Sequence, residues 1–272
     1  MGVKIVSSDL NGTLVHQHTM SDMIRLYIGQ EEFEQANAVF KRQTSGQASM
    51  EEAFKTAGPL TRGLTLSQAV DYVDQRMAYV NGFQEFVDSL RREDLPFVIN
   101  STGYSVTIHA IRERIGRDRI HGMIGNNLVF GIDADSAQEL RDDELEAKIT
   151  AYCNGARGPE FDRIKAIGEV RLGITDEAAK ASLINEYVAQ HFPEVKRNEI
   201  AHIGDTMGDS GGILGIAEQG GLGIAFNYNT PLHDYLQGEI TRNPILSGRI
   251  HFVDQKSESS DLVNVLPMIL AS

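Results

Sequence analysis

Near its start the chain reads Lys4-Ile5-Val6-Ser7-Ser8-Asp9-Leu10-Asn11-Gly12-Thr13-Leu14. The β-rich residues 3–8 predict a short buried strand that delivers Asp9 into a glycine turn. A carboxylate in that position has the chemistry of a nucleophile. Asn-Gly is also a common hairpin turn. The rest of the sequence is needed to decide between a turn that carries a nucleophile and an ordinary hairpin.

A second acidic turn occurs far along the chain, where residues 202–210 read HIGDTMGDS. Residues 200–203 predict another buried strand, and Asp205 and Asp209 follow it in a second glycine turn. Carboxylate oxygens are the ligands that hard divalent cations prefer. The two turns therefore predict one cation site that the fold assembles.

Short apolar strands alternate with helices along most of the chain, which is typical of an α/β protein with a parallel sheet. Further strands are predicted at residues 96–103, 169–174, 220–227 and 250–253, and residues 121–130 predict a strand, a turn and a second short strand. Helices are predicted at residues 83–92, 106–115, 133–151 and 176–191. Ligands of such sheets bind at the carboxyl ends of the strands.

From residue 19 to about residue 82, apolar side chains recur at helical spacing, with breaks at Gly46, Gly58-Pro59 and Gly63. This segment is longer than one crossover helix needs. We therefore expect a small helical bundle inserted after the first strand. The predicted organisation is a core of residues 1–15 and 83–272 with a helical cap of residues 16–82.

The composition of the chain limits which partners the protein can bind and where in the cell we expect it. The formal net charge of −13 argues against a surface for nucleic acid or an anionic membrane, because both need clustered Lys and Arg. Cys153 is the only cysteine, which excludes an intramolecular disulfide and a thiolate metal cluster. The sequence has no stretch near the roughly 18 apolar residues of a membrane span, and the residues before Asp9 do not resemble a secretory signal. We therefore expect a cytoplasmic protein.

Residues 9–14, DLNGTL, resemble the first motif, DxDGT, of the haloacid dehalogenase superfamily of aspartate-nucleophile phosphatases. The resemblance implies that Asp9 attacks a phosphoryl group to form an aspartyl-phosphate. It also implies that Gly12 lets the backbone come close to the phosphoryl oxygens. Asn11 replaces the second Asp of the motif.

Two further motifs of the family follow in order. The second is a strand that ends in Ser or Thr and holds the phosphoryl group; Thr102, followed by Gly103, matches it, with Ser101 as the near alternative. The third is a Lys at the start of a helix, which Lys180 matches. The resemblance implies that Lys180 pairs with Asp9 and neutralises charge during transfer. Taken alone, both motifs also fit an ordinary helix cap and a surface lysine.

The fourth motif is GDxxxD, and residues 204–209 match it as GDTMGD. In the family these carboxylates hold Mg²⁺. The resemblance therefore assigns a magnesium site to Asp9, Asp205, Asp209 and the backbone carbonyl of Asn11.

The detail is similar to the phosphoserine-phosphatase-like branch, which has a Rossmann-like core and a helical cap. That branch also has an Asn-x-Leu-x-Phe hairpin like residues 127–130 and a run like residues 221–227, whereas residues 131–168 form a longer segment than expected. Cap residues set specificity in this family, and no motif anchors them here. The substrate therefore stays open; Arg62 and Glu32 are candidate cap contacts or ordinary surface residues.

In the family the second Asp of the first motif protonates the leaving group and then activates water. Asn11 keeps a carbonyl ligand but cannot move that proton at neutral pH. Such acid–base catalysis contributes roughly 10²–10⁴ in rate. Three accounts stay open: a deliberately disabled enzyme, a natural enzyme with another base or an activated leaving group, and a pseudoenzyme. His16 and His18 are candidate bases, or exposed loop histidines.

The predicted function is Mg²⁺-dependent phosphoryl transfer from a small phosphorylated metabolite to water. Asp9, Asn11 and Lys180 are the predicted catalytic residues, and Gly12, Thr102 and Gly103 the predicted substrate-binding residues. The alternative is a non-catalytic phosphometabolite-binding protein of the same fold. A metal-free dehalogenase fits poorly, because it would leave the acidic turn at residues 204–209 without a role.

Overall fold

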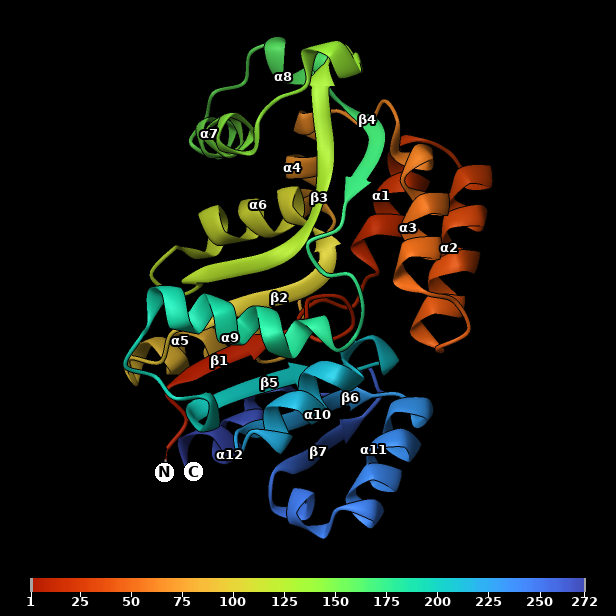
Figure 1. The fold of residues 1–272 in the computed structure, drawn as a ribbon. Helices are drawn as coiled ribbons and strands as arrows, with labels where there is room; N and C mark the ends of the chain where they lie inside the picture. Colours follow the sequence, from red (N-terminus) through yellow and green to blue (C-terminus); the bar gives the residue numbers. More distant parts are fainter. Residues whose placement is uncertain (1, 272) are drawn as a thin grey trace.

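The fold is built around one twisted sheet, seen in a computed structural model that describes residues 2–271 (Figure 1). Within that range the strand order is β4-β3-β2-β1-β5-β6-β7. The strands are β1 (Ile5–Ser8), β2 (Phe97–Tyr104), β3 (Gly122–Ile132), β4 (Ile164–Arg171), β5 (Ile200–Gly204), β6 (Leu222–Tyr228) and β7 (Ile250–Gln255). All neighbouring pairs are parallel except β3 and β4, which are antiparallel. The predicted α/β fold class is confirmed.

Strand β1 lies at the centre of the sheet, between β2 and β5. Its last residue, Ser8, pairs with Ile99 of β2 and with Ile203 of β5. The backbone amide of Asp9 then donates to the carbonyl of Ile203, at 2.9 Å. Asp9 therefore leaves the sheet at the carboxyl edge, beside the end of β5.

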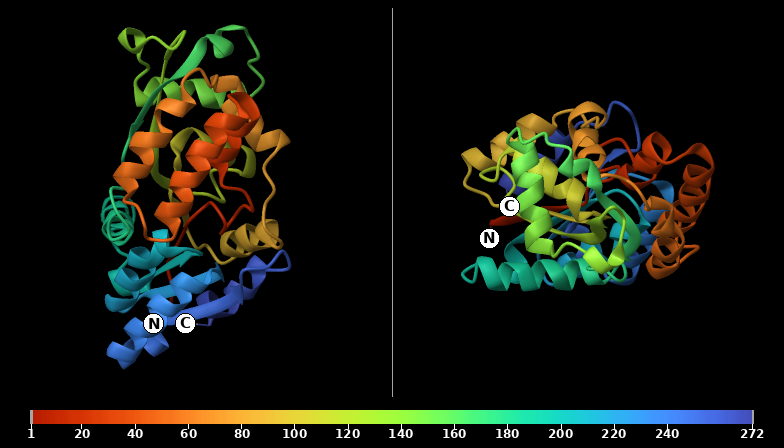
Figure 2. Two further views of the ribbon diagram at one scale, coloured as in Figure 1. Left: turned by 90° about the vertical axis from the view of Figure 1, so that its right-hand side faces the viewer. Right: turned by 90° about the horizontal axis from the view of Figure 1, so that it is seen from above.

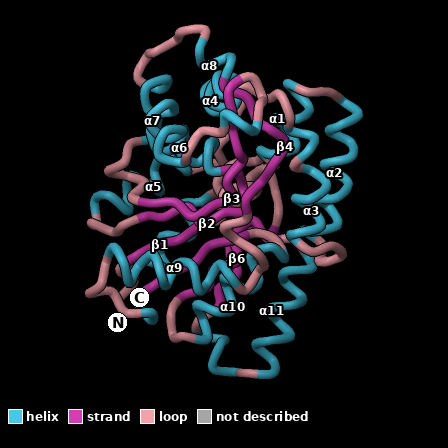
Figure 3. Tube along the Cα trace, turned by 45° about the horizontal axis from the view of Figure 1, so that its top comes forward, coloured by secondary structure: helices cyan, strands magenta, loops and turns pink. Residues whose placement is uncertain are grey.

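Apolar residues cover both faces of the central strands. Ile5 of β1 packs with the side chains of α9 (Ala179–His191) and α10 (Ser210–Glu218), whereas Val6 packs with α5 (Phe83–Arg92) and α6 (Ser105–Ile115). Successive side chains of a strand point to opposite faces, so two helical layers bury the sheet. Figure 3 shows the strands passing between these layers. Helix α11 (Thr230–Arg242) extends the first layer and α12 (Leu266–Leu270) lies near the chain ends.

A group of helices stands beyond the carboxyl edge of the sheet. It comprises α1 (Thr19–Tyr27), α2 (Gln30–Thr44), α3 (Met50–Ala57) and α4 (Leu66–Gln75). Figure 1 shows α1 to α3 to the right of the strand ends, and the left view of Figure 2 looks onto them. Local capping sets two of the starts, because Ser49 accepts from the amide of Glu52 and Thr65 forms a reciprocal capping box with Gln68.

Strand β3 and its antiparallel partner β4 form an arm that rises from the sheet beside these helices (Figure 1). The strand, turn and strand predicted for residues 121–130 are wrong, and so is the hairpin within residues 127–130: β3 is one continuous strand. It pairs with β2 as far as Asn126 and with β4 from Asn127 onward. The Gly-Asn-Asn sequence at residues 125–127 therefore marks a change of partner strand rather than a turn.

The segment between β3 and β4 contains α7 (Asp142–Cys153) and α8 (Glu160–Arg163), both packed against α4. The strand predicted at residues 169–174 begins earlier, at Ile164, because pairing with β3 recruits residues whose own pattern is weak. Throughout residues 2–271, no helix has the length and apolar character needed to cross a membrane.

Candidate active site

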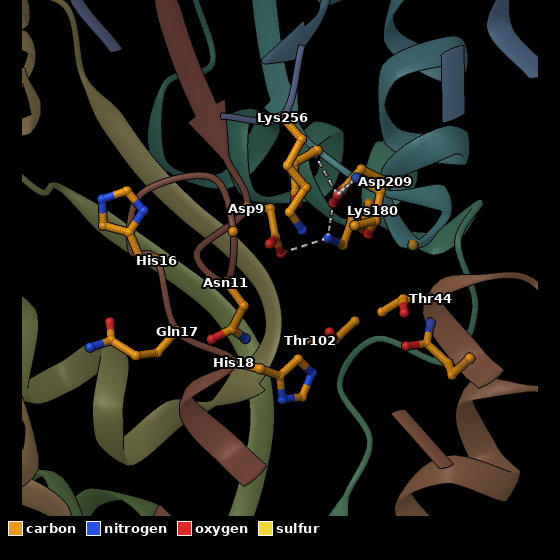
Figure 4. A pocket seen from close by; sticks show the side chains of 15 residues that line it. Asp9, Asn11, His16, Gln17, His18, Thr44, Thr102, Lys180, Asp209 and Lys256 are labelled. Atoms are coloured by element: carbon orange, nitrogen blue, oxygen red, sulfur yellow. Dashed lines mark hydrogen bonds and ion pairs between the residues drawn. The ribbon is translucent and has the colours of Figure 1, made fainter. Parts of the chain in front are cut away.

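Asp9 lies at the carboxyl edge of the sheet with 5% of its surface exposed. Oδ1 of Asp9 accepts a hydrogen bond from Nζ of Lys180 at 2.8 Å, and the same ammonium donates to Oδ1 of Asp209. Lys180 is 1% exposed and sits in the first turn of α9, where Asp176 caps the helix through the amide of Ala179. A buried lysine thus joins carboxylates from two distant turns (Figure 4).

The acidic turn between β5 and α10 contains the 3₁₀ helix η4 (Met207–Asp209). Oδ2 of Asp209 accepts from the backbone amides of Asp205 and Thr206, at 3.1 and 3.2 Å. A Cβ at Gly204 would overlap the Asp209 side chain, so only glycine permits this close turn. These bonds hold Asp209 against the backbone while Oδ1 faces Lys180.

The turn after Asp9 packs directly against Asp205. Thr13 donates its hydroxyl to Oδ1 of Asp205 at 3.2 Å. Gly12 has a φ of +84°, and a Cβ there would overlap Oδ2 of Asp205. The carbonyl of Gly12 accepts from Nδ2 of Asn227, at the end of β6, at 2.7 Å. Three strand ends therefore fix the position of this turn.

Crowding of buried carboxylates changes the acidity of the site. Burial and the neighbouring charge of Asp209 raise the pKa of Asp9 to about 6, although Lys180 opposes this shift. Burial, followed by the charges of Asp209 and Asp9, raises the pKa of Asp205 well above its usual value. Burial alone would lower the pKa of Lys180, but Asp209 and Asp9 more than offset it, so that pKa is raised. Asp9 is therefore mostly ionised at pH 7.

Asp9, Asp205 and Asp209 form a group suited to a hard divalent cation. One carboxylate oxygen from each lies within 4.8 Å of the others, and all three residues are buried. Lys180 is paired with Asp9 and Asp209 but not with Asp205, so one buried ammonium does not neutralise all three carboxylates. Mg²⁺ prefers a few carboxylates together with water and phosphate oxygens. The donor set thus fits Mg²⁺.

The end of β2 supplies the hydroxyl groups next to Asp9. Thr102 is partly buried and lines the cavity in front of Asp9. Ser101 is fully buried; its hydroxyl accepts from the amide of Gly103 at 3.1 Å, and its hydrogen bond favours the ionised form of Asp9. Gly103 is buried beside the amide of Asn11 and is not part of the cavity lining that the structure describes.

Asn11 turns its two amide atoms in different directions. Oδ1 accepts from the amide and the hydroxyl of Thr19, at 2.9 and 2.8 Å. The side chain therefore caps the start of α1, while its NH₂ group is held away from Thr19. Asn11 lines the cavity opposite Asp9 (Figure 4).

A cavity of about 150 Å³ opens between these strand ends and the helices beyond them. Its lining comprises Asp9, Asn11, Gly12, His16, Gln17, His18, Gln43, Thr44, Thr102, Lys180, Asp205, Thr206, Gly208, Asp209 and Lys256. The predicted residues Asp9, Asn11, Gly12, Thr102, Lys180, Asp205 and Asp209 thus meet around one space.

Of the other candidate residues, two line the cavity and two do not. His16 is exposed and His18 partly buried, and both line the cavity. Burial lowers the pKa of His18 to about 4, so its ring is neutral at pH 7. Arg62 instead reaches the carbonyl of Ala134, and neither Arg62 nor Glu32 is among the described residues that line the cavity.

Several residues of the site, among them Gln43, Lys256 and Asn227, were not predicted from the sequence. Gln43 lines the cavity from the last turn of α2, and no local pattern marks it. Lys256 follows β7 at the same carboxyl edge. Its positive charge partly opposes the rise in the pKa of Asp205. Asn227, the last residue but one of β6, lies in the left-handed region with a φ of 52°. Lys256 lies shortly after a predicted strand and Asn227 is the last residue of another, so the reasoning that pointed to Asp9 and Asp205 could have found both.

We compared the sequence with known protein families and curated proteins. No protein-family model matches the chain. A curated phosphoserine phosphatase from Archaeoglobus fulgidus is 22% identical over 244 residues, which cover 89% of this chain but 58% of that protein. The chain thus spans less than two thirds of the length of this relative.

Solved structures show the same fold. A phospho-aspartyl intermediate analogue of a phosphoserine phosphatase superposes with a TM-score of 0.65 at 18% identity, covering 99% of this chain and 100% of the other. A haloacid dehalogenase family hydrolase from Salmonella enterica serovar Typhi gives 0.62 at 15% identity, over 86% of this chain and 66% of the other. The chain therefore shares the fold of a phosphoserine phosphatase and of a haloacid dehalogenase family hydrolase, and its sequence is similar to a curated phosphoserine phosphatase.

Proposed function

We propose that the protein is a Mg²⁺-dependent phosphatase that acts on a small phosphomonoester through an aspartyl-phosphate. The observation that carries this proposal is the buried pairing of Asp9 with Lys180 at the mouth of one cavity. A carboxylate with a pKa of about 6 is mostly an anion at pH 7, and the nearby ammonium can neutralise charge on an incoming phosphoryl group.

In the first step, a carboxylate oxygen of Asp9 attacks phosphorus, and the bond from phosphorus to the ester oxygen breaks. The electron pair stays on the alcohol oxygen, which takes a proton from water, because Asn11 has none to give at neutral pH. Water then attacks the phosphorus of the acyl phosphate, releasing inorganic phosphate and restoring the Asp9 carboxylate. Thr102 and Lys180 bind and orient the phosphoryl oxygens throughout.

Asp9, Asp205, Asp209 and the carbonyl of Asn11 would hold Mg²⁺. When bound, Mg²⁺ would neutralise phosphoryl charge and orient the group for in-line attack. Thr13 and the amides of residues 205 and 206 keep the two carboxylates of the acidic turn oriented for this role.

Residues 16–82, in our proposal, act as a cap that excludes water from the site, with the arm of β3 and β4 packed beside them. Gln43 and Thr44 reach the cavity from this segment and support the idea. A cytoplasmic location stays a prediction from the sequence.

A second candidate is a phosphometabolite-binding protein without turnover. Asn11 favours it, because the position of the family's acid–base residue carries an amide. Phosphate release from a panel of small phosphomonoesters, with and without Mg²⁺, separates the two. Release that needs Mg²⁺ and is lost in Asp9→Asn supports the phosphatase, whereas binding without release supports the alternative. Neither binding nor release rejects both.

A further inference from the structure

The wall of the cavity that faces the carboxylates carries no Lys, Arg, Asp or Glu side chain in the described structure. The charged residues of the lining are Asp9, Asp205, Asp209, Lys180 and Lys256, all on the strand ends or the helices of the core. The opposite wall, contributed by residues 16–18 and 43–44, consists of histidine, glutamine and threonine. The part of a substrate that faces this wall therefore meets polar side chains and no Lys, Arg, Asp or Glu.

Gln43 is the most informative group of this wall. It is 6% exposed and lies in the last turn of α2, with its Nε2 directed toward Gly208 of the core. Within residues 2–271 its side-chain amide makes no hydrogen bond to another residue, and the residue lines the cavity. The amide offers two donors and one acceptor oxygen to whatever occupies that cavity. A bound ligand with hydroxyl groups would satisfy it.

The neighbouring side chains leave the same kind of hydrogen-bonding capacity. Thr44 donates its hydroxyl to the carbonyl of Phe40 at 3.0 Å, so its oxygen can only accept from a ligand. Asn11 presents its NH₂ group, because Thr19 occupies its oxygen. His18 is neutral at pH 7, because burial lowers its pKa to about 4. The wall thus offers both donors and acceptors, and a hydroxyl group can bond to both.

A phosphorylated amino acid is a poor match for this wall. Its ammonium and carboxylate would lose their hydration without meeting an opposite charge there, which is unfavourable for buried ions.

We propose that the site accepts small phosphomonoesters of uncharged, hydroxyl-bearing alcohols and discriminates against phosphorylated amino acids, with Gln43 as the specificity-determining residue. This inference rests on the proposed function, because it takes the phosphoryl group to bind at Asp9 and Lys180. It departs from what the names of the relatives suggest, since those proteins are phosphoserine phosphatases.

The test compares inorganic phosphate, glycerol 2-phosphate, phosphoserine and phosphoethanolamine on the unaltered protein in Mg²⁺. Preference is measured as kcat/KM where phosphate is released and as Kd by calorimetry where it is not. We expect glycerol 2-phosphate to be preferred over phosphoserine by at least about tenfold, the factor that corresponds to one poorly matched polar contact. Equal or better use of phosphoserine overturns the inference and leaves the phosphatase proposal standing. Failure of every ligand, inorganic phosphate included, overturns both.

Variants at Gln43 test its role. Gln43→Met should weaken glycerol 2-phosphate by about 3- to 10-fold and leave inorganic phosphate unchanged, because only the hydroxyl contacts are lost. Gln43→Glu should shift preference toward phosphoethanolamine, whose ammonium would meet the new carboxylate. Gln47→Glu, an exposed position outside the cavity lining, makes the same charge change as a control. Variants that bind inorganic phosphate normally but keep the original preference remove Gln43 from the proposal; should a variant fail to fold, the ligand comparison on the unaltered protein decides.

Discussion

Nζ of Lys180 lies 2.8 Å from Oδ1 of Asp9, although 171 residues separate the two in the sequence. Both side chains are almost completely buried, and the same ammonium also contacts Asp209. The lysine is therefore the one cation that the described interior places among three carboxylates. This contact joins the end of β1 to the start of α9, so the site depends on the packing of that helix against the sheet.

Replacing Lys180 should destabilise the fold. Lys180→Met leaves three buried carboxylates without a cation, and we expect the free energy of unfolding to fall by about 3–5 kcal/mol. The loss should shrink in Mg²⁺, which would replace the missing positive charge. Urea unfolding followed by circular dichroism measures both effects, with the exposed Lys55→Met as a control that stays within about 0.5 kcal/mol. Equal stability of the two variants would contradict this role.

Asn11→Asp should restore acid–base catalysis. Asp and Asn are close in shape, so one oxygen can keep both bonds to Thr19 while the other takes the place of the NH₂ group at the cavity. We expect phosphate release to rise by about 10²–10⁴. Asn11→Ala is the comparison, since it removes the amide without supplying a proton donor. No gain on any phosphomonoester that demonstrably binds would reject this interpretation of Asn11.

Magnesium should raise the melting temperature of the protein. Binding to the native state stabilises it, and the cation relieves repulsion among Asp9, Asp205 and Asp209. Asp205→Asn should lose most of the increase, whereas Asp143→Asn, on the exposed start of α7, should keep it. Thermal scans in millimolar Mg²⁺ and in chelator give the comparison. An identical response of both variants would argue against the site.

Gly12→Ala should be more disruptive than a glycine replacement elsewhere. Gly12 has a φ of +84°, and the new Cβ would also overlap the Asp205 carboxylate. Gly63→Ala provides the control, because its φ is +93° and nothing lies within 4 Å of the added atom. Backbone strain alone costs about 1–2 kcal/mol, so the control should lose that much and Gly12→Ala clearly more. Similar losses in urea unfolding would show that Asp205 moves aside freely.

His202 should make the protein less stable in mild acid. Burial, reinforced by the charge of Lys180, lowers the pKa of His202 from 6.5 to about 3. Below pH 6.5 the unfolded chain binds a proton that the folded protein refuses, so the free energy of unfolding falls as the pH drops toward 3. Asp9 acts in the opposite direction, because its raised pKa of about 6 lets the folded state take up a proton first.

The difference between the unaltered protein and His202→Asn isolates the histidine. In the variant, the free energy of unfolding between pH 6 and pH 4 should fall less steeply, by up to about 1.4 kcal/mol per pH unit. Parallel curves for the two proteins would show that His202 does not carry this dependence.

The sequence by itself determined the class of fold and indicated most of the charged residues that meet in the cavity. Short apolar runs followed by turns mark Asp9 and Asp205, and the start of an amphipathic helix marks Lys180; these are local patterns. Parallel strands bring their carboxyl ends to one edge, so local patterns suffice to bring such residues together.

Only the tertiary structure decided which strands pair and which side chains reach the cavity. Residues 121–130 contain a turn-like Gly-Asn-Asn sequence, yet long-range pairing with β2 and then β4 keeps β3 continuous. Gln43 has no local signal, because its position at the cavity depends on how α2 packs over the strand ends. The direction of the Asn11 amide likewise follows from Thr19 at the start of α1. Contacts between distant segments set these features, since no short stretch of sequence encodes the partner that it will meet.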